Sequence, residues 1–317
     1  MTGSSVNSLD AIEVIPSGAA LAAEVRGIDL SQPLPDDVQA RLTEIWAEHL
    51  VLLLRGQELE DDDLIRFSDY YGGQQMGGAR KKRWEIGMKE SGKAASTDAR
   101  VNYVTNLDKD GNPAQHNRGT GSYELRWHSD NTYVDVPPTG TMLWADVIPD
   151  DDSGQTEFCN QIRAYAEMPE DLRALIQGKH MMHDGSRNTA NLVHPHREMP
   201  KTQDDIDGPV HPMVRVHPPT GKHALFLGRR WDFPSTYIVE MPNDEGEALM
   251  DRLWAHATQD KYVWTHHWKR GDFILWDNRA VMHRRTAINS NQPRILHRTM
   301  IKGVPVAAAW DSNAAAD

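Results

Sequence analysis

Trp127-His128-Ser129-Asp130 places an imidazole and a carboxylate two residues apart, at the point where an apolar-rich stretch ends. Alternate residues of an extended chain share one face. The side chains of His128 and Asp130 can therefore point at a single ion. This stretch predicts a metal site at the end of a β-strand.

A second histidine completes the pattern far along the chain. His283 follows Phe273-Ile274-Leu275-Trp276-Asp277-Asn278-Arg279, an apolar strand that runs into a polar turn. Two histidines and one carboxylate form the ligand set of non-haem Fe(II) oxygenases. The same residues are also compatible with a surface hydrogen-bonded pair at a strand end, without any metal.

Two arginines follow in a strand-like run, Pro293 to Met300. Arg294 and Arg298 are four residues apart, so their side chains face the same way on a strand. A buried arginine needs an anion as partner, and an iron enzyme with a dicarboxylate co-substrate needs such a cation near its metal. Alternatively, both are solvated residues on an edge strand.

Length and composition are those of one large globular domain. The chain has 317 residues, of which 39% are hydrophobic, and no linker divides it. Because the candidate ligands span residues 128 to 283, the chain between them must fold as one unit. We therefore expect a single domain over residues 1–317.

Charge and cysteine content narrow the function class. A formal charge of -12 argues against nucleic-acid binding as a main role. Cys159 is the only cysteine, which suits a reducing cytosol. Since no apolar run approaches about 18 residues and no signal peptide precedes the domain, we expect a cytoplasmic protein with no membrane partner.

The periodicity of apolar residues predicts several helices and many short strands. Helices are expected over 36–49, from about 61, and over 170–177 and 245–258. Strands are expected over 51–54, 140–147, 213–216, 224–227, 262–265, 272–276 and 294–301. Many short strands with Pro- and Gly-containing turns favour a jelly roll or barrel.

Motifs spread over nearly the whole chain resemble one known family. They are 18–30, Val51 to Gln57, His128 to Tyr133 with Pro137-Pro138, Gly154-Gln155-Thr156, 211–222 and Trp276 to Arg298. Together they are similar to the Fe(II)/2-oxoglutarate-dependent dioxygenases typified by taurine dioxygenase and 2,4-dichlorophenoxyacetate dioxygenase. The resemblance implies a mostly β fold with flanking helices, the double-stranded β-helix (a cupin-like jelly roll).

The same resemblance implies roles for six residues. His128, Asp130 and His283 would bind Fe(II). Arg294 and Thr156 would bind the distal carboxylate of 2-oxoglutarate, and Arg298 would contact the acidic group of the substrate. The expected reaction consumes O2 and 2-oxoglutarate, releases succinate and CO2, and hydroxylates a small organic anion such as a carboxylate, a sulfonate or an aryloxyalkanoate. A carboxylate among the ligands argues for hydroxylation over halogenation.

A basic segment at residues 80–93 lies in what the resemblance implies is a lid-like insertion over about 74–126. One interpretation is a mobile loop that attracts an anionic substrate; the other is a solvated charge run. Residues 307–317 are expected to form a flexible tail. The remaining histidine pairs, at 180 and 183, 194 and 196, and 266 and 267, are expected to be structural.

Two alternatives to the dioxygenase stay open. One is a catalytically silent metal-binding β-sandwich, and the other is a zinc hydrolase that uses the same triad. A silent binder has no reason to keep both the triad and Arg294, which favours the enzyme. The sequence names neither the substrate nor the oligomeric state, and a homo-oligomer is compatible with it. Aromatic residues near the candidate ligands indicate either an aromatic-lined pocket or core.

Overall fold

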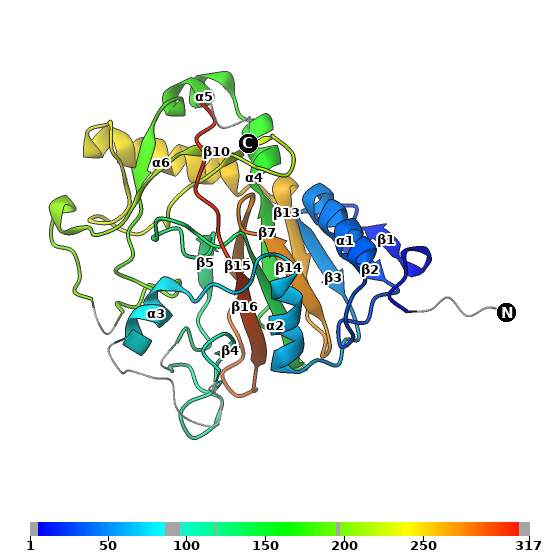
Figure 1. Ribbon diagram of the computed structural model, residues 1–317. Coiled ribbons are helices and arrows are strands. Elements are labelled where there is room, and N and C mark those ends of the chain that lie inside the picture. The colour runs from blue at the N-terminus through cyan, green and yellow to red at the C-terminus, as the bar shows by residue number, and fades with distance from the viewer. Residues whose placement is uncertain (1–5, 86–95, 97, 118, 195–196, 311–317) are drawn as a thin grey trace.

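A computed structural model describes residues 6–85, 96, 98–117, 119–194 and 197–310. Its centre is a pair of β-sheets (Figure 1). The larger, seven-stranded sheet has the spatial order β1 (Glu13–Pro16), β2 (Ala23–Arg26), β3 (Val51–Leu54), β14 (Phe273–Asp277), β6 (Gly140–Val147), β16 (Ile295–Ile301) and β4 (Asn102–Thr105). The four-stranded sheet has the order β13 (Val263–His266), β7 (Thr156–Asn160), β15 (Val281–Arg285) and β5 (Leu125–His128).

The other elements surround this pair. The helices are α1 (Asp36–His49), α2 (Asp61–Asp69), α3 (Gly78–Glu85), α4 (Gln161–Ala166), α5 (Glu170–Ile176) and α6 (Asn243–Ala257). Two small sheets consist of β12 (Tyr237–Ile238), β8 (His180–Met182) and β9 (Val210–Pro212), and of β10 (Val214–Val216) and β11 (His223–Leu225). Short 3-10 helices cover Leu9–Ala11, Gln203–Asp205 and Asp260–Tyr262.

Alternation along the strands separates three layers of core. In β3, Leu52 and Leu54 pack with α1 and α2, whereas Val51 and Leu53 face the space between the two sheets. In β15, Met282 packs in a third cluster with α4, α5 and α6. Because neighbouring residues of a strand point to opposite faces, His283 is directed into the space between the sheets.

Helix α1 shows why the outer layer forms. Its buried side chains are Val38, Leu42, Ile45 and Trp46, spaced three or four residues apart, so they form one apolar stripe. Asp36 and Asp37 lie in the first turn, where the helix dipole favours negative charge. Leu50 ends the helix in the left-handed conformation with φ 64° and leads directly into β3. In Figure 1, α1 and α2 are drawn in front of the strands, and α6 crosses the upper part of the view.

The expected jelly roll with flanking helices is confirmed. The predictions for 36–49, 51–54 and 140–147 match α1, β3 and β6 at both ends, and the other predicted elements are present with bounds shifted by one or two residues. Two interpretations differ from the structure. Part of the basic segment, which one interpretation took as a mobile loop, forms α3. Ala307 and Ala309 hydrogen bond with β10, so the described part of the expected tail is held in place, whereas 311–317 lie outside the described residues.

No helix in the described part of the chain combines the length and the apolar character needed to cross a membrane.

Candidate active site

The first candidate ligand, His128, is the last residue of β5. In the antiparallel pairing of β5 with β15, it lies directly opposite His283, and the two ring centroids are 4.1 Å apart. The backbone carbonyl of Arg126 lies 2.7 Å from His128 Nδ1 and accepts its hydrogen. That bond leaves Nε2 as the nitrogen available to a metal, 3.8 Å from Asp130 Oδ1.

Asp130 reaches the site from a turn, not from the strand. Because β5 ends at His128, the expected alternation along an extended chain does not place Asp130; the turn after β5 does. Asn278 holds this turn: its Oδ1 accepts from the Asp130 backbone N–H at 2.6 Å, and its Nδ2 donates to the Asp130 carbonyl at 2.9 Å. Thr141, on β6, donates its hydroxyl to Asp130 Oδ2 at 2.8 Å.

His283 lies in the middle of β15 on the inner face. Its ring packs against Trp276, with centroids 4.7 Å apart, and against Phe158 at 6.2 Å. Neither ring nitrogen has a hydrogen-bond partner in the described part of the chain, and Nδ1 is fully buried. A buried imidazole without a hydrogen-bond partner, beside a second imidazole and a carboxylate, fits the role of a metal ligand.

The candidate ligand atoms of His128, Asp130 and His283 lie within 4.8 Å of one another, and all three side chains are less than a tenth exposed. Among the described residues, this is the one such cluster of three or more histidine, cysteine or acidic side chains. Two imidazole nitrogens and one carboxylate oxygen fit Fe(II), and they leave room for further ligands.

The protonation states favour a divalent cation. Burial lowers the pKa of His128 well below its usual value, and the neighbouring His283 lowers it further. Burial likewise lowers the pKa of His283 to about 4. Burial alone would raise the pKa of Asp130, but attraction to His283, which is protonated below about pH 4, and to Arg298 lowers it to about 2. Neutral imidazoles and an ionised carboxylate are the forms that coordinate metals.

Arg294 and Thr156 meet at one end of the space between the sheets. Arg294 is 1% exposed and lies just before β16, and its Nη2 donates to the Gly154 carbonyl at 3.3 Å. Trp268 Nε1 donates to Thr156 Oγ1 at 3.0 Å, which leaves the Thr156 hydroxyl hydrogen free to bond an acceptor. The guanidinium of Arg294 lies 5.8 Å from the Trp268 ring. Arg294 and Thr156 thus form one polar, buried corner.

Arg298 occupies the same face of β16, nearer to the candidate ligands. Its Nη1 lies 3.8 Å from Asp130 Oδ1, and its side chain is 25% exposed. Arg229 adds a second positive charge, because its guanidinium contributes to lowering the pKa values of both His128 and His283. It lies 4.8 Å from the ring of Tyr133, which follows Asp130 by three residues. The site is therefore electropositive around its acidic ligand.

Two residues of the site were not singled out from the sequence. Asn278 stands in a quoted motif, but its contact with Asp130 depends on the fold. Arg285 is 3% exposed and lies two residues after His283, on the same inner face of β15. The sequence did contain a signal for Arg285: it follows His283 by two residues, so the two side chains share one face of a strand.

The expectation of structural roles agrees with the contacts of most other histidines. His266 is buried and lies 3.0 Å from Asp272, whereas His267 is exposed and pairs with Asp152, so the two face opposite sides. His180 bonds Glu240 at the surface. His183 is buried among His211 and Phe226. His194 is also buried, and His196 lies outside the described residues.

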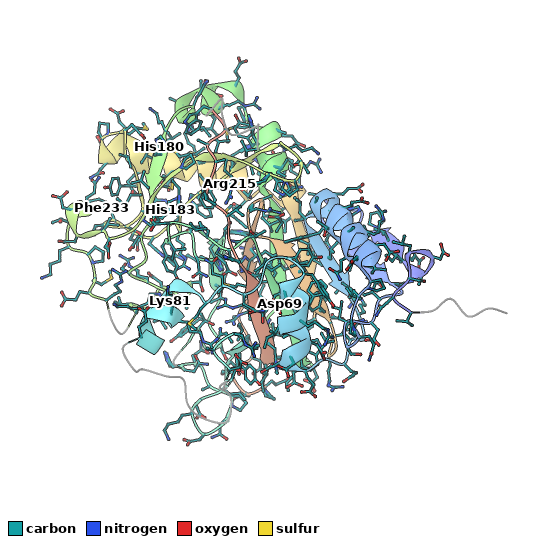
Figure 2. All side chains as sticks on the ribbon, in the orientation of Figure 1. Asp69, Lys81, His180, His183, Arg215 and Phe233 are labelled. Carbon is teal, nitrogen blue, oxygen red and sulfur yellow. The ribbon has the colours of Figure 1, made fainter. Side chains whose placement is uncertain are left out.

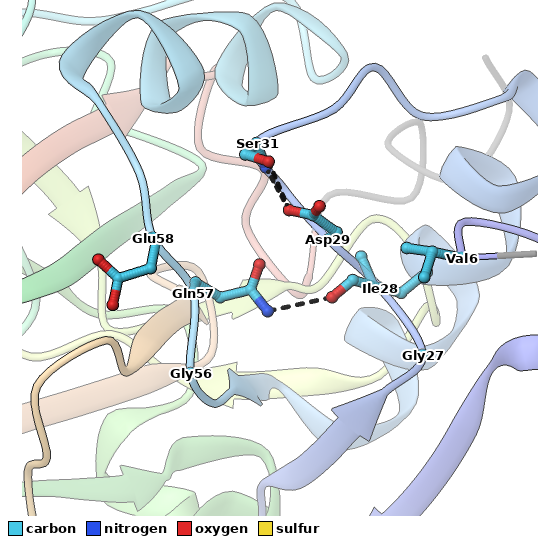
Figure 3. A pocket seen from close by; sticks show the side chains of 8 residues that line it. All are labelled: Val6, Gly27, Ile28, Asp29, Ser31, Gly56, Gln57 and Glu58. Atoms are coloured by element: carbon cyan, nitrogen blue, oxygen red, sulfur yellow. Dashed lines mark hydrogen bonds between the residues drawn. The ribbon is translucent and has the colours of Figure 1, made fainter.

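The aromatic residues near the ligands divide between core and site. Trp144 packs with α1 in the outer core layer, and its Nε1 donates to the Gln57 carbonyl. Tyr133 lies under Arg229 and donates its hydroxyl to Asn131. A separate hollow near the N-terminal strands is lined by Val6, Gly27, Ile28, Asp29, Ser31, Gly56, Gln57 and Glu58 (Figure 3). It includes none of the candidate site residues.

Comparison with known proteins agrees with this geometry. Residues 13–300 match the family model described as taurine catabolism dioxygenase TauD, TfdA family. The chain is 28% identical to an (S)-phenoxypropionate/alpha-ketoglutarate-dioxygenase of Delftia acidovorans, over 93% of this chain and 96% of that protein. It is 30% identical to an alpha-ketoglutarate-dependent 2,4-dichlorophenoxyacetate dioxygenase of Cupriavidus pinatubonensis, over 89% and 95% of the two chains.

A solved structure supports the fold assignment. The crystal structure of AAD-2 in complex with Mn(II) and N-oxalylglycine superposes with a TM-score of 0.76 at 25% identity, covering 94% of this chain and 98% of that one. The family model alone spans far more than half of the sequence. The chain belongs to the TauD, TfdA family of dioxygenases.

Proposed function

We propose that this dioxygenase hydroxylates a small organic anion, with Fe(II) held by His128, Asp130 and His283. Its use of Fe(II), 2-oxoglutarate and O2 follows from its family and from the character of these three side chains. The observation that carries the proposal is the convergence of these three side chains within 4.8 Å. Next to them, the buried Arg285 and Arg294 have no acidic partner in the described part of the chain. Bound Fe(II) would supply the oxidising chemistry.

The protein's own task is to position the two organic reactants. Arg294 and Thr156 would hold the distal carboxylate of 2-oxoglutarate in the buried corner. Arg298 would pair with the acidic group of the substrate and so fix which C–H bond faces the metal. Oxidation of 2-oxoglutarate to succinate and CO2 uses one oxygen atom of O2, and the other enters the substrate as a hydroxyl group.

We propose aryloxyalkanoates as the substrate class, on the basis of two relatives. The relatives from Delftia acidovorans and Cupriavidus pinatubonensis carry phenoxypropionate and 2,4-dichlorophenoxyacetate in their names. Both compounds combine a carboxylate with an aromatic ring. The guanidiniums of Arg298 and Arg229 would suit the carboxylate, and the Tyr133 ring is one apolar surface beside them.

We infer that residues 1–317 act as one dioxygenase domain. Within this domain, the segment 74–126 would cover the bound substrate as a lid. Gly77 lies against Met300 and Asn131, which brings the start of this segment next to the metal ligands. Lys81 and Lys82, on α3, are exposed and would attract an anion (Figure 2 labels Lys81). Residues 86–93 of the basic segment lie outside the described residues.

We propose a cytoplasmic enzyme without nucleic-acid or membrane partners. The charge of -12 and the lone, buried Cys159 support this proposal. A reducing compartment also keeps iron in the Fe(II) state. A measurement of mass in solution would test for a homo-oligomer.

The decisive experiment measures succinate in reactions that contain Fe(II), 2-oxoglutarate and a panel of anions. Aryloxyalkanoates, sulfonates and alkyl sulfates are compared, each with and without O2. We expect substrate-dependent succinate that requires iron and O2 together. Substrate cleavage that proceeds with zinc and without O2 would instead identify a hydrolase. A protein that binds Fe(II) but forms no succinate with any anion would be the silent binder.

A further inference from the structure

The buried corner beside Thr156 contains two guanidiniums. Arg285 and Arg294 are 3% and 1% exposed, and neither forms an ion pair with any described carboxylate. They come from different sheets, Arg285 from β15 and Arg294 from the residue before β16. A buried charge without a counter-ion is strongly unfavourable, so two of them in one corner indicate a site built for an anion.

Strand register places Arg285 at this corner. In the pairing of β15 with β7, Arg285 lies directly opposite Thr156, and His283 lies opposite Phe158. Directly opposed residues of antiparallel strands have Cβ atoms about 5 Å apart. Because His283 and Arg285 share the inner face, Arg285 extends this face from the candidate metal ligand toward Thr156.

Arg294 reaches the same corner from the facing sheet. Its Nη2 donates to the Gly154 carbonyl, two residues before Thr156. A Cβ added at Gly154 would lie 3.3 Å from Arg294 Nε, so the arginine packs directly on this glycine. The positive charge of Arg285 also helps to lower the pKa of Arg294, after the larger effect of burial. The two guanidiniums therefore lie within electrostatic reach of each other.

Their unused hydrogens define what the corner can bind. In both arginines Nε and Nη1 are buried and have no acceptor in the described part of the chain. Arg285 Nη2 donates to the carbonyls of Gly121 and Tyr123, which fixes the side chain without consuming the other nitrogens. The four unpartnered nitrogens carry six N–H hydrogens, enough to fill the roughly four acceptor positions that the two oxygens of a carboxylate offer.

We propose that Arg285 is a second guanidinium for the distal carboxylate of 2-oxoglutarate, acting together with Arg294. This inference rests on the proposed function, because it assumes that 2-oxoglutarate occupies this corner. In this role, Arg285 selects 2-oxo acids that carry a second carboxylate. Because Arg285 also holds Gly121 and Tyr123, its position joins the co-substrate corner to the segment proposed as the lid.

The test compares two keto acids of equal chain length. 2-Oxopentanoate has a methyl group where 2-oxoglutarate has its distal carboxylate, and both can chelate iron. Binding is measured anaerobically on the Fe(II)-loaded enzyme through the visible absorption band of the chelate. We expect Arg285→Met to raise the Kd of 2-oxoglutarate by about 10- to 100-fold. The Kd of 2-oxopentanoate should change by less than about twofold.

Arg284→Met is the matched control. Arg284 is the next residue on β15 but faces the opposite side, where it pairs with Glu157 and lies 5.0 Å from the Trp127 ring. The Arg284→Met variant should bind both keto acids with the same Kd values as the unmodified enzyme. Equal weakening of both acids by Arg285→Met would show a purely structural arginine and overturn the proposal, as would unchanged binding of 2-oxoglutarate.

A second variant keeps the test decisive if Arg285→Met does not fold. In Arg294→Met, Arg285 remains, so a preference for 2-oxoglutarate over 2-oxopentanoate of about tenfold should persist. Complete loss of that preference would overturn the proposal. If the unmodified enzyme forms no chelate band with either acid, the proposed function itself fails, which is a distinct result.

Discussion

Asn278 bonds both backbone polar groups of Asp130 across a sequence separation of 148 residues. The same side-chain amide also donates to the Pro138 carbonyl at 3.0 Å. One residue in the turn between β14 and β15 thus fixes the turn after β5. Asn278 precedes His283 in the same segment of the chain. This one segment therefore positions both His283 and Asp130, although Asp130 is far away in sequence.

Asn278→Asp should weaken metal binding. The substituted carboxylate has almost the same shape but cannot donate, so it would repel the carbonyls of Asp130 and Pro138. Loss of such a supporting bond lowers metal affinity by about 10- to 100-fold. Titration of the apo-protein with Fe(II) under anaerobic conditions measures the change. Asn243→Asp, at the exposed first residue of α6, makes the same chemical substitution and should leave the affinity unaltered.

Asp130→Ala and Arg294→Ala should fail in different ways. Without its carboxylate, the site should lose iron and all turnover. Without the guanidinium, iron should remain. The binding free energy of 2-oxoglutarate should weaken by about 2 to 5 kcal/mol, because a desolvated charge pair is broken. Metal content and the concentration of 2-oxoglutarate at half-maximal rate separate the two outcomes. Identical losses in both variants would contradict the assigned roles.

Gly154→Ala should impair co-substrate binding specifically. Gly154 has φ +75°, and a Cβ there would lie 2.9 Å from Ile288 Cγ1 and 3.3 Å from Arg294 Nε. Pushing the arginine aside should cost about 1 to 2 kcal/mol, as inserting a methyl group into a packed site does, or about 5- to 30-fold in the Kd of 2-oxoglutarate. Gly221→Ala is the control, since Gly221 has φ +66° with no atom within 4 Å of such a Cβ. It imposes similar backbone strain without touching Arg294, so comparable weakening there would refute this explanation.

Arg298→Gln should raise the KM for the anionic substrate, with Fe(II) and 2-oxoglutarate binding retained. Removing one partner of a charge-assisted pair costs about 1.5 to 3 kcal/mol, which corresponds to a rise in KM of about 10- to 100-fold. Steady-state succinate assays with a saturating co-substrate give this value. The conservative Arg298→Lys should recover part of the loss. A KM that does not move in either variant would remove Arg298 from the substrate site.

His183→Phe should flatten the acid side of the stability profile. Both ring nitrogens of His183 are buried without a partner in the described part of the chain, and burial lowers its pKa well below the usual value. Below about pH 6.5 the unfolded chain takes up a proton that the folded protein does not, so stability is present above this pH and is lost as the pH falls. The free energy of unfolding should therefore decline by up to about 1.4 kcal/mol per pH unit through this residue.

Denaturant unfolding of the unmodified protein and of His183→Phe between pH 5 and pH 8 provides the comparison. Phenylalanine fits the contacts with His211 and Phe226, whose rings lie 5.0 and 5.4 Å from that of His183. Figure 2 marks the position of His183 in the molecule. Parallel profiles for the two proteins would show that His183 does not contribute to acid sensitivity.

Local patterns in the sequence were sufficient for many elements and for the metal-binding hypothesis. The apolar stripe of α1 and the short run Val51–Leu54 contain their own start and stop signals, so both bounds were predictable. His128 and Asp130 were predictable as neighbours from their spacing. The strand and turn before His283 singled it out as the second histidine, and spacing placed Arg294 and Arg298 on one face. The resemblance supplied Thr156 and the separate roles of the two arginines.

What sequence could not provide depends on pairing between distant strands. Arg285 becomes meaningful when β15 lies against β7 and places it opposite Thr156. Asn278 likewise acquires its role when the turn after β5 arrives beside it. No local pattern encodes either register. The position of Asp130 was predicted for an inexact reason, because a turn and not strand alternation directs its carboxylate.

Side chains alternate along β15, and this has an implication for how the enzyme could lose activity. If β15 slipped by a single residue against β7, His283 and Arg285 would both rotate outward, and Met282 and Arg284 would take their places. Iron coordination and co-substrate capture would then disappear in one event. Damage to this strand's alignment should therefore leave an inert protein, not one that consumes 2-oxoglutarate wastefully.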